Sequence, residues 1–205
     1  MTAILARKLG MTQVFAEDGH VERVTVLEAG PCPVTAIRTL ERDGYDAVQL
    51  AFGPTKEKHL SKAELGHLKK AGAPPMRHVR EFRGEAGELS VGETVTVDAF
   101  NVGDVVKVSG VSKGKGFQGT IKRHNFKRGP KSHGSHNVRA PGSIGASATP
   151  SRVLKGLRGA GHMGHRRVTQ KGLTVVDVRP DQNLLLVRGS VPGPRNGVVE
   201  VRTDG

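Results

Sequence analysis

The sequence predicts a mainly β protein: an antiparallel β-barrel with one short helix and one long irregular segment. Short runs of alternating apolar residues, separated by turn residues, recur in both the first half and the last third of the chain. Glycine accounts for 28 of the 205 residues, while Phe, Tyr and Trp are scarce. Many short strands with local turns and a modest core are typical of small β-barrels.

The first predicted strands form two hairpins. The strands cover residues 11–15, 21–28, 34–40 and 45–52. The first pair flanks the turn 17–20, which contains Asp18-Gly19, and the second pair flanks Arg42-Asp43-Gly44. Asp-Gly between apolar runs is a strong hairpin signal. Val24 and Val26, like Val48 and Leu50, follow the period of two that half-buried strands require.

One helix is predicted at about residues 61–72. Ser61 and Glu64 have the spacing of a capping box, and Leu65 and Leu68 follow at helical spacing before Gly72 ends the run. Three lysines of this helix are best explained as a solvated surface, with RNA contact as the alternative. These are Lys62, Lys69 and Lys70.

Further strands are predicted at residues 94–97, 105–111, 173–178, 184–188 and 198–202, with a turn at 180–183. Residues 112–167 show neither strand nor helix periodicity. A loop of this length is uncommon in a compact domain unless it is functional or disordered. We therefore expect residues 1–111 and 168–205 to form the barrel domain, with the helical insertion at 61–72. Residues 112–167 are expected to be an extended basic loop inserted into that domain and ordered by RNA.

The positive charge of the protein is concentrated in the same segment. No acidic residue occurs between Asp104 and Asp177, whereas those 72 residues carry 15 of the 32 Lys and Arg. The whole chain has a net charge of +13, so everything outside this stretch is close to neutral. A solvated face usually mixes both signs, so a long acid-free segment indicates neutralisation by a polyanion. Nucleic acid is the leading candidate, because Lys and Arg on phosphates supply most sequence-independent affinity.

Two motifs in the segment resemble other kinds of site. Gly114, Gly116 and Gly119 match the G-x-G-x-x-G pattern of dinucleotide-binding proteins, but no acidic residue follows at about 20 positions. We expect these glycines to let the backbone approach phosphates closely. The two His-x-x-His pairs at 133–136 and 162–165 offer four imidazoles, but no carboxylate is near in sequence to orient a metal ligand. No metal site and no cofactor are predicted.

Catalysis has no support in the residue pattern. The histidine-bearing segment contains no acid that could orient a histidine, so no catalytic triad is indicated. Phe117 and Phe126, the two aromatics there, suit stacking on bases and packing against the barrel rim equally well. So few aromatics favour recognition of folded RNA through backbone and shape.

Other classes of protein are excluded or disfavoured. The single Cys32 rules out internal disulfides and cysteine-rich zinc modules, and we expect a buried, idle thiol. No apolar run approaches the roughly 20 residues of a membrane helix, and residues 1–11 lack the apolar core of a signal peptide. We therefore expect a cytoplasmic protein with no membrane partner and no small-molecule substrate.

Several motifs, in order along the chain, resemble the family of large-subunit ribosomal protein L-three, in its bacterial type. They are Gly110-Val-Ser-Lys-Gly-Lys-Gly-Phe-Gln-Gly119 with Lys122-Arg123, Ser132-His-Gly-Ser135, Arg139-Ala-Pro-Gly-Ser-Ile-Gly145, Gly159-Ala-Gly-His-Met-Gly164 and Asn183-Leu-Leu-Leu-Val187 with Val191-Pro-Gly193. The start, residues 5–15, is also similar. The resemblance covers nearly the whole chain.

The resemblance implies a translation-protein-type β-barrel whose long internal extension penetrates RNA. It implies a structural constituent of the large ribosomal subunit that binds large-subunit rRNA, supports early assembly and extends towards the peptidyl transferase centre without chemistry. The tip would lie near residues 142–148, and neighbouring large-subunit ribosomal proteins would be further partners. Two positions depart from the family: Lys107 replaces an Asp or Asn, and Ala146 replaces a Gln that is often methylated.

The expected rRNA-binding residues are the cations, histidines and one serine of the segment and its flanks. They are Lys107, Lys113, Lys115, Lys122, Arg123, His124, Lys127, Arg128, Lys131, His133, His136, Arg139, Ser143, Arg152, Lys155, Arg158, His162, Arg166, Arg167 and Lys171. Two alternative hypotheses remain at this point: a free-standing RNA-modifying or RNA-cleaving enzyme, and a DNA-binding architectural protein.

Overall fold

The structure is a computed structural model that describes residues 2–16, 18–84 and 89–204. The chain divides into two compact units, which we call the barrel unit (residues 1–112 and 167–205) and the basic unit (residues 113–166).

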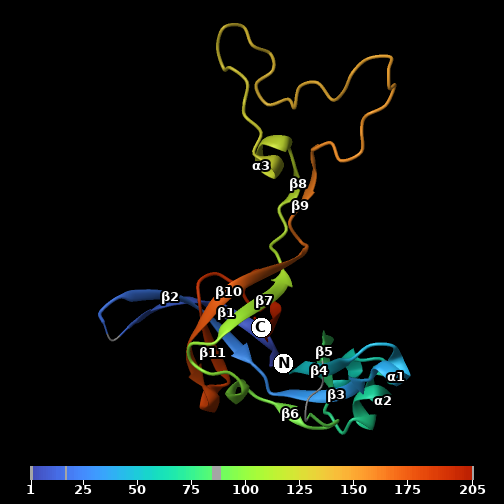
Figure 1. The fold of residues 1–205 in the computed structure, drawn as a ribbon, viewed down its shortest axis with the longest axis vertical. Helices are drawn as coiled ribbons and strands as arrows, with labels where there is room; N and C mark the ends of the chain where they lie inside the picture. The colour runs from blue at the N-terminus through green and yellow to red at the C-terminus, as the bar shows by residue number, and fades with distance from the viewer. Residues whose placement is uncertain (1, 17, 85–88, 205) are drawn as a thin grey trace. The chain divides into compact units, whose positions relative to one another are not determined.

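The barrel unit contains the closed antiparallel barrel that the sequence predicts. Its strands are β1 (Ala3–Phe15), β2 (Val21–Ala29), β7 (Val105–Val111), β10 (Arg167–Arg179), β11 (Leu184–Arg188) and β12 (Val198–Thr203). They follow the order β1-β12-β7-β10-β11-β2 around the barrel. Figure 1 labels β1, β2, β7, β10 and β11. Closure pairs every strand on both sides, so the barrel has no free edge. The mainly β fold is therefore confirmed.

The barrel is filled by small and branched aliphatic side chains. Ile4 and Leu5 of β1, Val106 and Val108 of β7, and Leu185 of β11 are all fully buried. They belong to one continuous core cluster. Burying a side chain of this kind stabilises a fold by roughly 1.5–3 kcal/mol. Aliphatic side chains make up most of this cluster, which also contains Phe52, Phe82 and Phe100.

A second sheet lies beside the barrel within the same unit. It consists of β3 (Cys32–Arg38), β4 (Ala47–Pro54), β5 (Met76–Arg83) and β6 (Thr94–Val95), in the order β5-β4-β3-β6. Both strands of the second predicted hairpin thus leave the barrel, contrary to our expectation of one barrel for all strands.

The burial of β4 explains this difference. Val48, Leu50 and Phe52 face the core cluster shared with the barrel, whereas Ala51 on the other face packs with Leu68. A strand buried on both faces needs cover on each side. Here the barrel covers one face and a helix covers the other.

That helix is α2 (Lys62–Lys70), and its predicted N-terminus is confirmed. The hydroxyl of Ser61 accepts a hydrogen bond from the backbone N–H of Glu64, and the Glu64 carboxylate accepts one from the backbone N–H of Ser61. The hydrogen bonds to Ser61 hold the pKa of Glu64 below its usual value. The helix is short, and Leu68 is its one buried residue.

Several connections and strand ends differ from those predicted from the sequence. The short helix α1 (Leu40–Asp43) joins β3 to β4, and Gly44 follows with a φ of 77°. The turns η1 (Glu57–His59), η2 (Val97–Ala99) and η3 (Pro180–Gln182) are 3₁₀ helices, so the strand predicted at 94–97 is only two residues long. Strand β10 begins six residues earlier than predicted, and its register shifts between Gln170 and Leu173. Glu17 of the first predicted turn lies outside the described residues.

Lys8 is a buried cation that the sequence did not single out. Its ammonium donates to the carbonyl oxygens of Val191 at 2.7 Å and Gly193 at 3.3 Å. A buried charge of this kind is tolerated only with such partners. The contact ties β1 to the Val191-Pro192-Gly193 loop, so this loop is part of the barrel framework.

Among the described residues, no helix is long and apolar enough to span a membrane.

Cys32 is buried, as expected, and its thiol donates weakly to the carbonyl oxygen of Leu5. Burial raises the pKa of this thiol to about 12. The folded protein therefore keeps the thiol protonated at pH values at which an exposed cysteine is already a thiolate.

We predict that Cys32 of the folded protein reacts very slowly with iodoacetamide at a pH of about 8.5, because only the thiolate is the nucleophile. In denaturant, where the thiol pKa returns to about 8.5, the reaction should be rapid. Mass spectrometry of the alkylated protein measures both rates. Equal rates in the folded and unfolded protein would contradict the buried placement.

Candidate nucleic-acid interface

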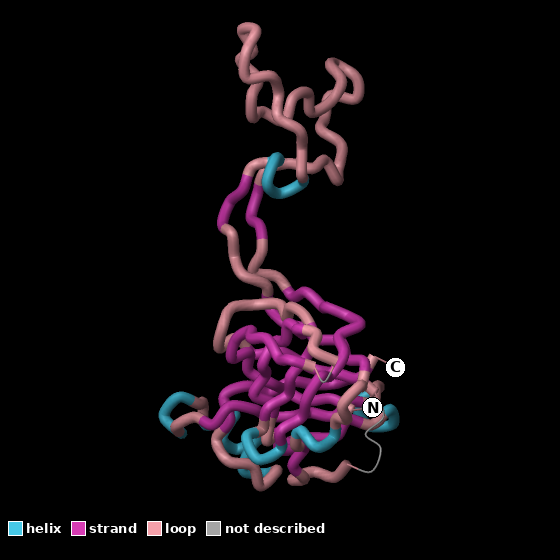
Figure 2. Tube along the Cα trace, turned by 90° about the vertical axis from the view of Figure 1, so that its left-hand side faces the viewer, coloured by secondary structure: helices cyan, strands magenta, loops and turns pink. Residues whose placement is uncertain are grey.

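The basic unit has almost no core of its own. It contains β8 (Gly116–Gln118), α3 (Thr120–His124) and β9 (Gly161–Met163), and residues 125–160 form neither helix nor strand (Figure 2). Thr120 is the one buried residue in 113–166, all of which the structure describes. Fixing a backbone costs roughly 1–2 kcal/mol per residue, which buried apolar area must offset. That offset is missing here.

A short two-stranded neck joins the two ends of this unit. Gly116 pairs with Met163 and Gln118 with Gly161. The backbone N–H of Lys115 donates to the carbonyl oxygen of Met163 at 2.9 Å. Gly164 has a φ of +75°, and a Cβ at this position would lie 2.2 Å from the carbonyl oxygen of Lys113. The neck therefore requires glycine at this position.

Two of the predicted rRNA-binding residues hold helix α3 against the segment that precedes β9. The Arg123 guanidinium donates to the carbonyl oxygen of Gly159 at 2.8 Å, and Nε2 of His124 lies 3.1 Å from the same oxygen. Both side chains are only partly exposed. We conclude that Arg123 and His124 position this unit in addition to any contact they make with a ligand.

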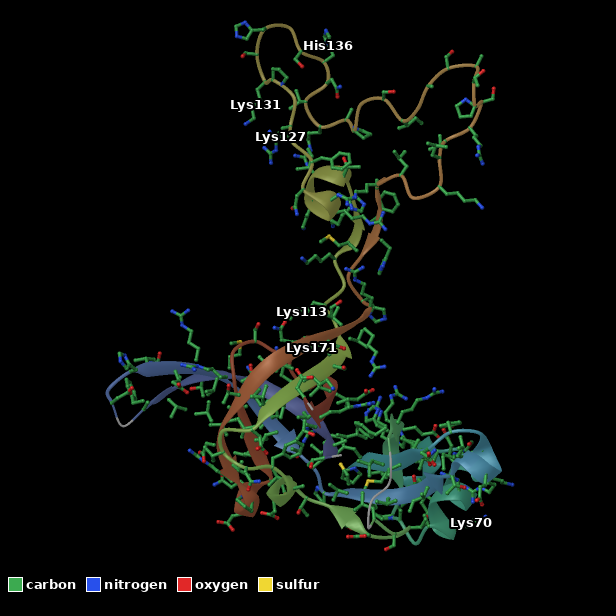
Figure 3. The ribbon with its side chains drawn as sticks, viewed as in Figure 1. Lys70, Lys113, Lys127, Lys131, His136 and Lys171 are labelled. Atoms are coloured by element: carbon green, nitrogen blue, oxygen red, sulfur yellow. The ribbon has the colours of Figure 1, made fainter. Side chains whose placement is uncertain are left out.

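The other predicted rRNA-binding residues of the basic unit are exposed. They are Lys113, Lys115, Lys122, Lys127, Arg128, Lys131, His133, His136, Arg139, Ser143, Arg152, Lys155, Arg158, His162 and Arg166. Figure 3 shows Lys127, Lys131 and His136 along the stretch that follows α3. Since residues 113–166 include no Asp or Glu, no carboxylate side chain within the unit can neutralise these cations.

The remaining three predicted rRNA-binding residues belong to barrel strands. Lys107 of β7 forms an ion pair with Asp204 at 3.2 Å, and Arg167 of β10 forms one with Glu200. Lys171, also on β10, is exposed. Two of these three cations are thus already partnered by carboxylates of the same unit.

The G-x-G-x-x-G glycines lie at the start of the neck and at α3. Gly116 begins β8 with a φ of +66°, and Gly119 precedes α3, which has five residues. A dinucleotide site uses the N-terminus of a long helix in a βαβ unit, which these residues do not form. Across the described residues, no group of three or more His, Cys, Asp or Glu side chains could hold a metal ion.

Phe117 is 76 % exposed, whereas Phe126 is partly buried with its ring centroid 6.2 Å from that of His124. The two aromatics therefore differ: Phe117 is open to a ligand, and Phe126 packs beside α3. Stacking of either ring on a base stays a prediction.

Sequence reasoning missed a second group of cations in the barrel unit. Arg80 of β5 and Arg202 of β12 lie near Glu200. Arg202 and Arg83 of β5 also line a surface cleft together with Lys107. Their signal was weak because the chain outside the acid-free segment has almost no net charge. The spacing of Arg77, Arg80 and Arg83 could have revealed the two arginines of β5, whereas Arg202 is the single cation of β12.

Comparison with known proteins agrees with this arrangement. The model of the family "Ribosomal protein L3" matches residues 85–183. A large ribosomal subunit protein uL3 from Acidothermus cellulolyticus is 56% identical over 202 residues, which cover 98% of this chain and 91% of that protein. The chain belongs to the ribosomal protein L3 family.

Other members of the ribosomal protein L3 family are nearly as similar. The uL3 proteins of Acaryochloris marina and Synechococcus sp. are 51% and 53% identical, and each match covers 97% of this chain. The matches cover 94% and 93% of those proteins. The family resemblance read from the motifs is therefore confirmed. These relatives are ribosomal proteins and not enzymes, which agrees with the expectation of no catalysis.

We predict that Gly164→Ala opens the neck. A left-handed backbone costs a residue with a Cβ about 1–2 kcal/mol, and the contact with the Lys113 carbonyl adds to this cost. Hydrogen exchange at the Lys115 amide, which donates across the neck, should become faster. Gly119→Ala is the matched control, because a Cβ at Gly119 meets nothing within 4 Å. Unchanged exchange in Gly164→Ala would refute the role of this contact.

Proposed function

We propose that this protein is a structural constituent of the large ribosomal subunit and that it binds large-subunit rRNA mainly through the basic unit. The observation that carries the proposal is the composition of that unit. Its 54 residues hold 12 Lys and Arg, no Asp or Glu, and one buried side chain. Such a chain gains little from folding alone and much from contact with a polyanion.

The relatives support RNA of the ribosome as this polyanion. Each is named as a protein of the large ribosomal subunit, and the matches span both the barrel unit and the basic unit. The proposal places residues 142–148 at the tip of an extension that reaches towards the peptidyl transferase centre. It also assigns the protein to early subunit assembly in the cytoplasm, with other ribosomal proteins as neighbours.

The proposed mechanism of binding is electrostatic and depends on backbone geometry. The exposed cations neutralise phosphates, and the arginines among them can hold phosphate oxygens in pairs. The neck and the contacts of Arg123 and His124 with Gly159 fix where the unit begins, so that fewer residues must be ordered on binding.

We predict that neutralising three neighbouring cations weakens RNA binding and its dependence on salt. The variant combines Lys127→Gln, Arg128→Gln and Lys131→Gln, which change three exposed side chains of the basic unit. Because each phosphate contact releases about one counterion, the slope of log affinity against log salt should fall by about three. Filter binding of a large-subunit rRNA transcript at several salt concentrations measures the slope.

The control removes the same number of charges from α2, by Lys62→Gln, Lys69→Gln and Lys70→Gln. These lysines are exposed, and α2 packs on the second sheet. We expect the parent slope in this control. Equal losses in both variants would show that net charge and not the basic unit determines the affinity.

Co-sedimentation separates this function from its alternatives. The protein should sediment with large subunits at physiological salt, and duplex DNA should compete poorly with rRNA. A protein found free of large subunits would contradict the proposal and favour a free-standing enzyme. Equal competition by duplex DNA would favour an architectural DNA-binding protein.

A further inference from the structure

A basic cleft lies within the barrel unit. It has a volume of about 670 Å³ and is lined by residues of β5, β7, β10 and β12. Five of its eight lining residues are cations: Arg83, Lys107, Arg167, Lys171 and Arg202. The others are Glu81, Ser109 and Thr169, so no apolar side chain lines the cleft.

The carboxylates of this region balance its cations only in part, since Asp204 pairs with Lys107 at 3.2 Å but the arginines share a single carboxylate. Glu200 pairs with Arg167, and it also lies 3.8 Å from Arg202 and 4.0 Å from Arg80. One carboxylate therefore serves three guanidinium groups, each of which carries several N–H donors. A smaller hollow of about 280 Å³, which shares Arg167 with the cleft, is lined by Arg80 and Glu200.

Glu81 adds little further compensation, because its carboxylate is already engaged elsewhere. It accepts hydrogen bonds from the Tyr45 hydroxyl at 2.8 Å, from Gln49 at 3.1 Å and from Arg38 at 3.3 Å. The hydrogen bond from Tyr45, followed by those from Arg38 and Gln49, holds the pKa of Glu81 below its usual value. Glu81 thus stays ionised, but it is bonded to groups outside the set of cleft cations.

Two of the cleft arginines are held in place by aromatic rings. The guanidinium carbon of Arg202 lies 4.7 Å from the ring centroid of Phe82, and that of Arg83 lies 4.7 Å from the ring centroid of Tyr45. Stacking of this kind fixes the plane of a guanidinium and leaves its edge free for an anion. The donors of these two arginines are therefore arranged before any ligand arrives.

Holding these cations together is unfavourable without an anion. Burial lowers the pKa of Arg202, and the neighbouring charge of Arg167 lowers it further, while Glu200 opposes both effects. Like charges that are kept close by stacking and strand pairing are typical of a binding site for an external anion.

We propose that this cleft binds successive phosphates of an RNA backbone and forms a second RNA contact, distinct from the basic unit. The inference rests on the proposed function, since it names a second surface for the same class of partner. The hydroxyls of Ser109 and Thr169, 2.7 Å apart in the cleft, add neutral donors for phosphate oxygens.

Two observations favour RNA over an acidic protein segment. Protein interfaces centre on aromatic or aliphatic anchors in apolar pockets, and the cleft has no apolar lining residue. In addition, Arg167 directly follows the basic unit in the chain, and Lys107 lies on β7, which leads into that unit. One polyanion can therefore engage cations on strands that are continuous in sequence with the first site.

The test uses the full-length chain and a transcript of bacterial large-subunit rRNA. The variant Arg83→Gln with Lys171→Gln removes two exposed cations and leaves the Glu200 ion pairs intact. The slope of log affinity against log salt should fall by about two. The matched control, Arg23→Gln with Lys69→Gln, removes one exposed Arg and one exposed Lys outside the cleft and should keep the parent slope.

Lysine acetylation followed by mass spectrometry identifies the occupant. In the parent protein, the rRNA transcript should protect Lys171 and leave Lys69 reactive, whereas polyglutamate should protect neither. Protection of Lys171 by polyglutamate but not by RNA would overturn the proposal in favour of an acidic protein partner.

The two proposals fail in different ways. If the parent binds rRNA with a steep salt slope and the cleft variant has the same slope, the cleft proposal alone is overturned. Equal losses in the cleft variant and its control overturn it as well. If the parent shows no salt-dependent binding to rRNA, the proposed function is overturned, and the cleft proposal with it.

Discussion

The pairing of β7 with β10 inside a closed barrel is the constraint on which the rest of the structure depends. Val111 lies opposite Arg167, and Gly110 lies between Val168 and Val199 of its two neighbouring strands. A Cβ on Gly110 would be 2.9 Å from Cγ1 of Val199, so any larger residue here would displace the Val199 side chain. The two strands that lead into and out of the basic unit are thereby fixed side by side. Closing so long a segment costs entropy that the segment cannot recover by itself, and the barrel core supplies the stability.

The barrel unit and the basic unit differ in how their positive charges are balanced. In the barrel unit, many arginines have carboxylate partners, such as Glu28 for Arg7 and Glu22 for Arg188. In the basic unit no carboxylate side chain exists, and repulsion among the cations opposes any compact state. The protein thus combines a stable barrel with a cationic segment that is suited to an external polyanion. The cluster around Glu200 is intermediate, because its arginines have a partner but share it.

The sequence predicted the features that depend on local patterns, and the structure shows why others were not predictable. The capping box at Ser61 and the strands β7 and β11 depend on neighbouring residues, so their positions followed from the sequence. Strand β5 was missed because its alternation is masked by charge, as is common for an edge strand that pairs on one side only. The second sheet was assigned to the barrel because period two in β4 reveals a strand but not its partner. The Glu200 cluster joins residues from β5, β10 and β12, and no local pattern brings those strands together.

The central claim is that the basic unit gains its order from RNA and not from a core. Hydrogen exchange of the intact protein, free and bound to a large-subunit rRNA transcript, tests this claim most directly. In the free protein, amides of residues 125–158 should exchange almost at once while the amides of β7 and β10 stay protected, and RNA should slow exchange in 125–158. Slow exchange of 125–158 in the free protein, or no change on RNA binding, would contradict the account.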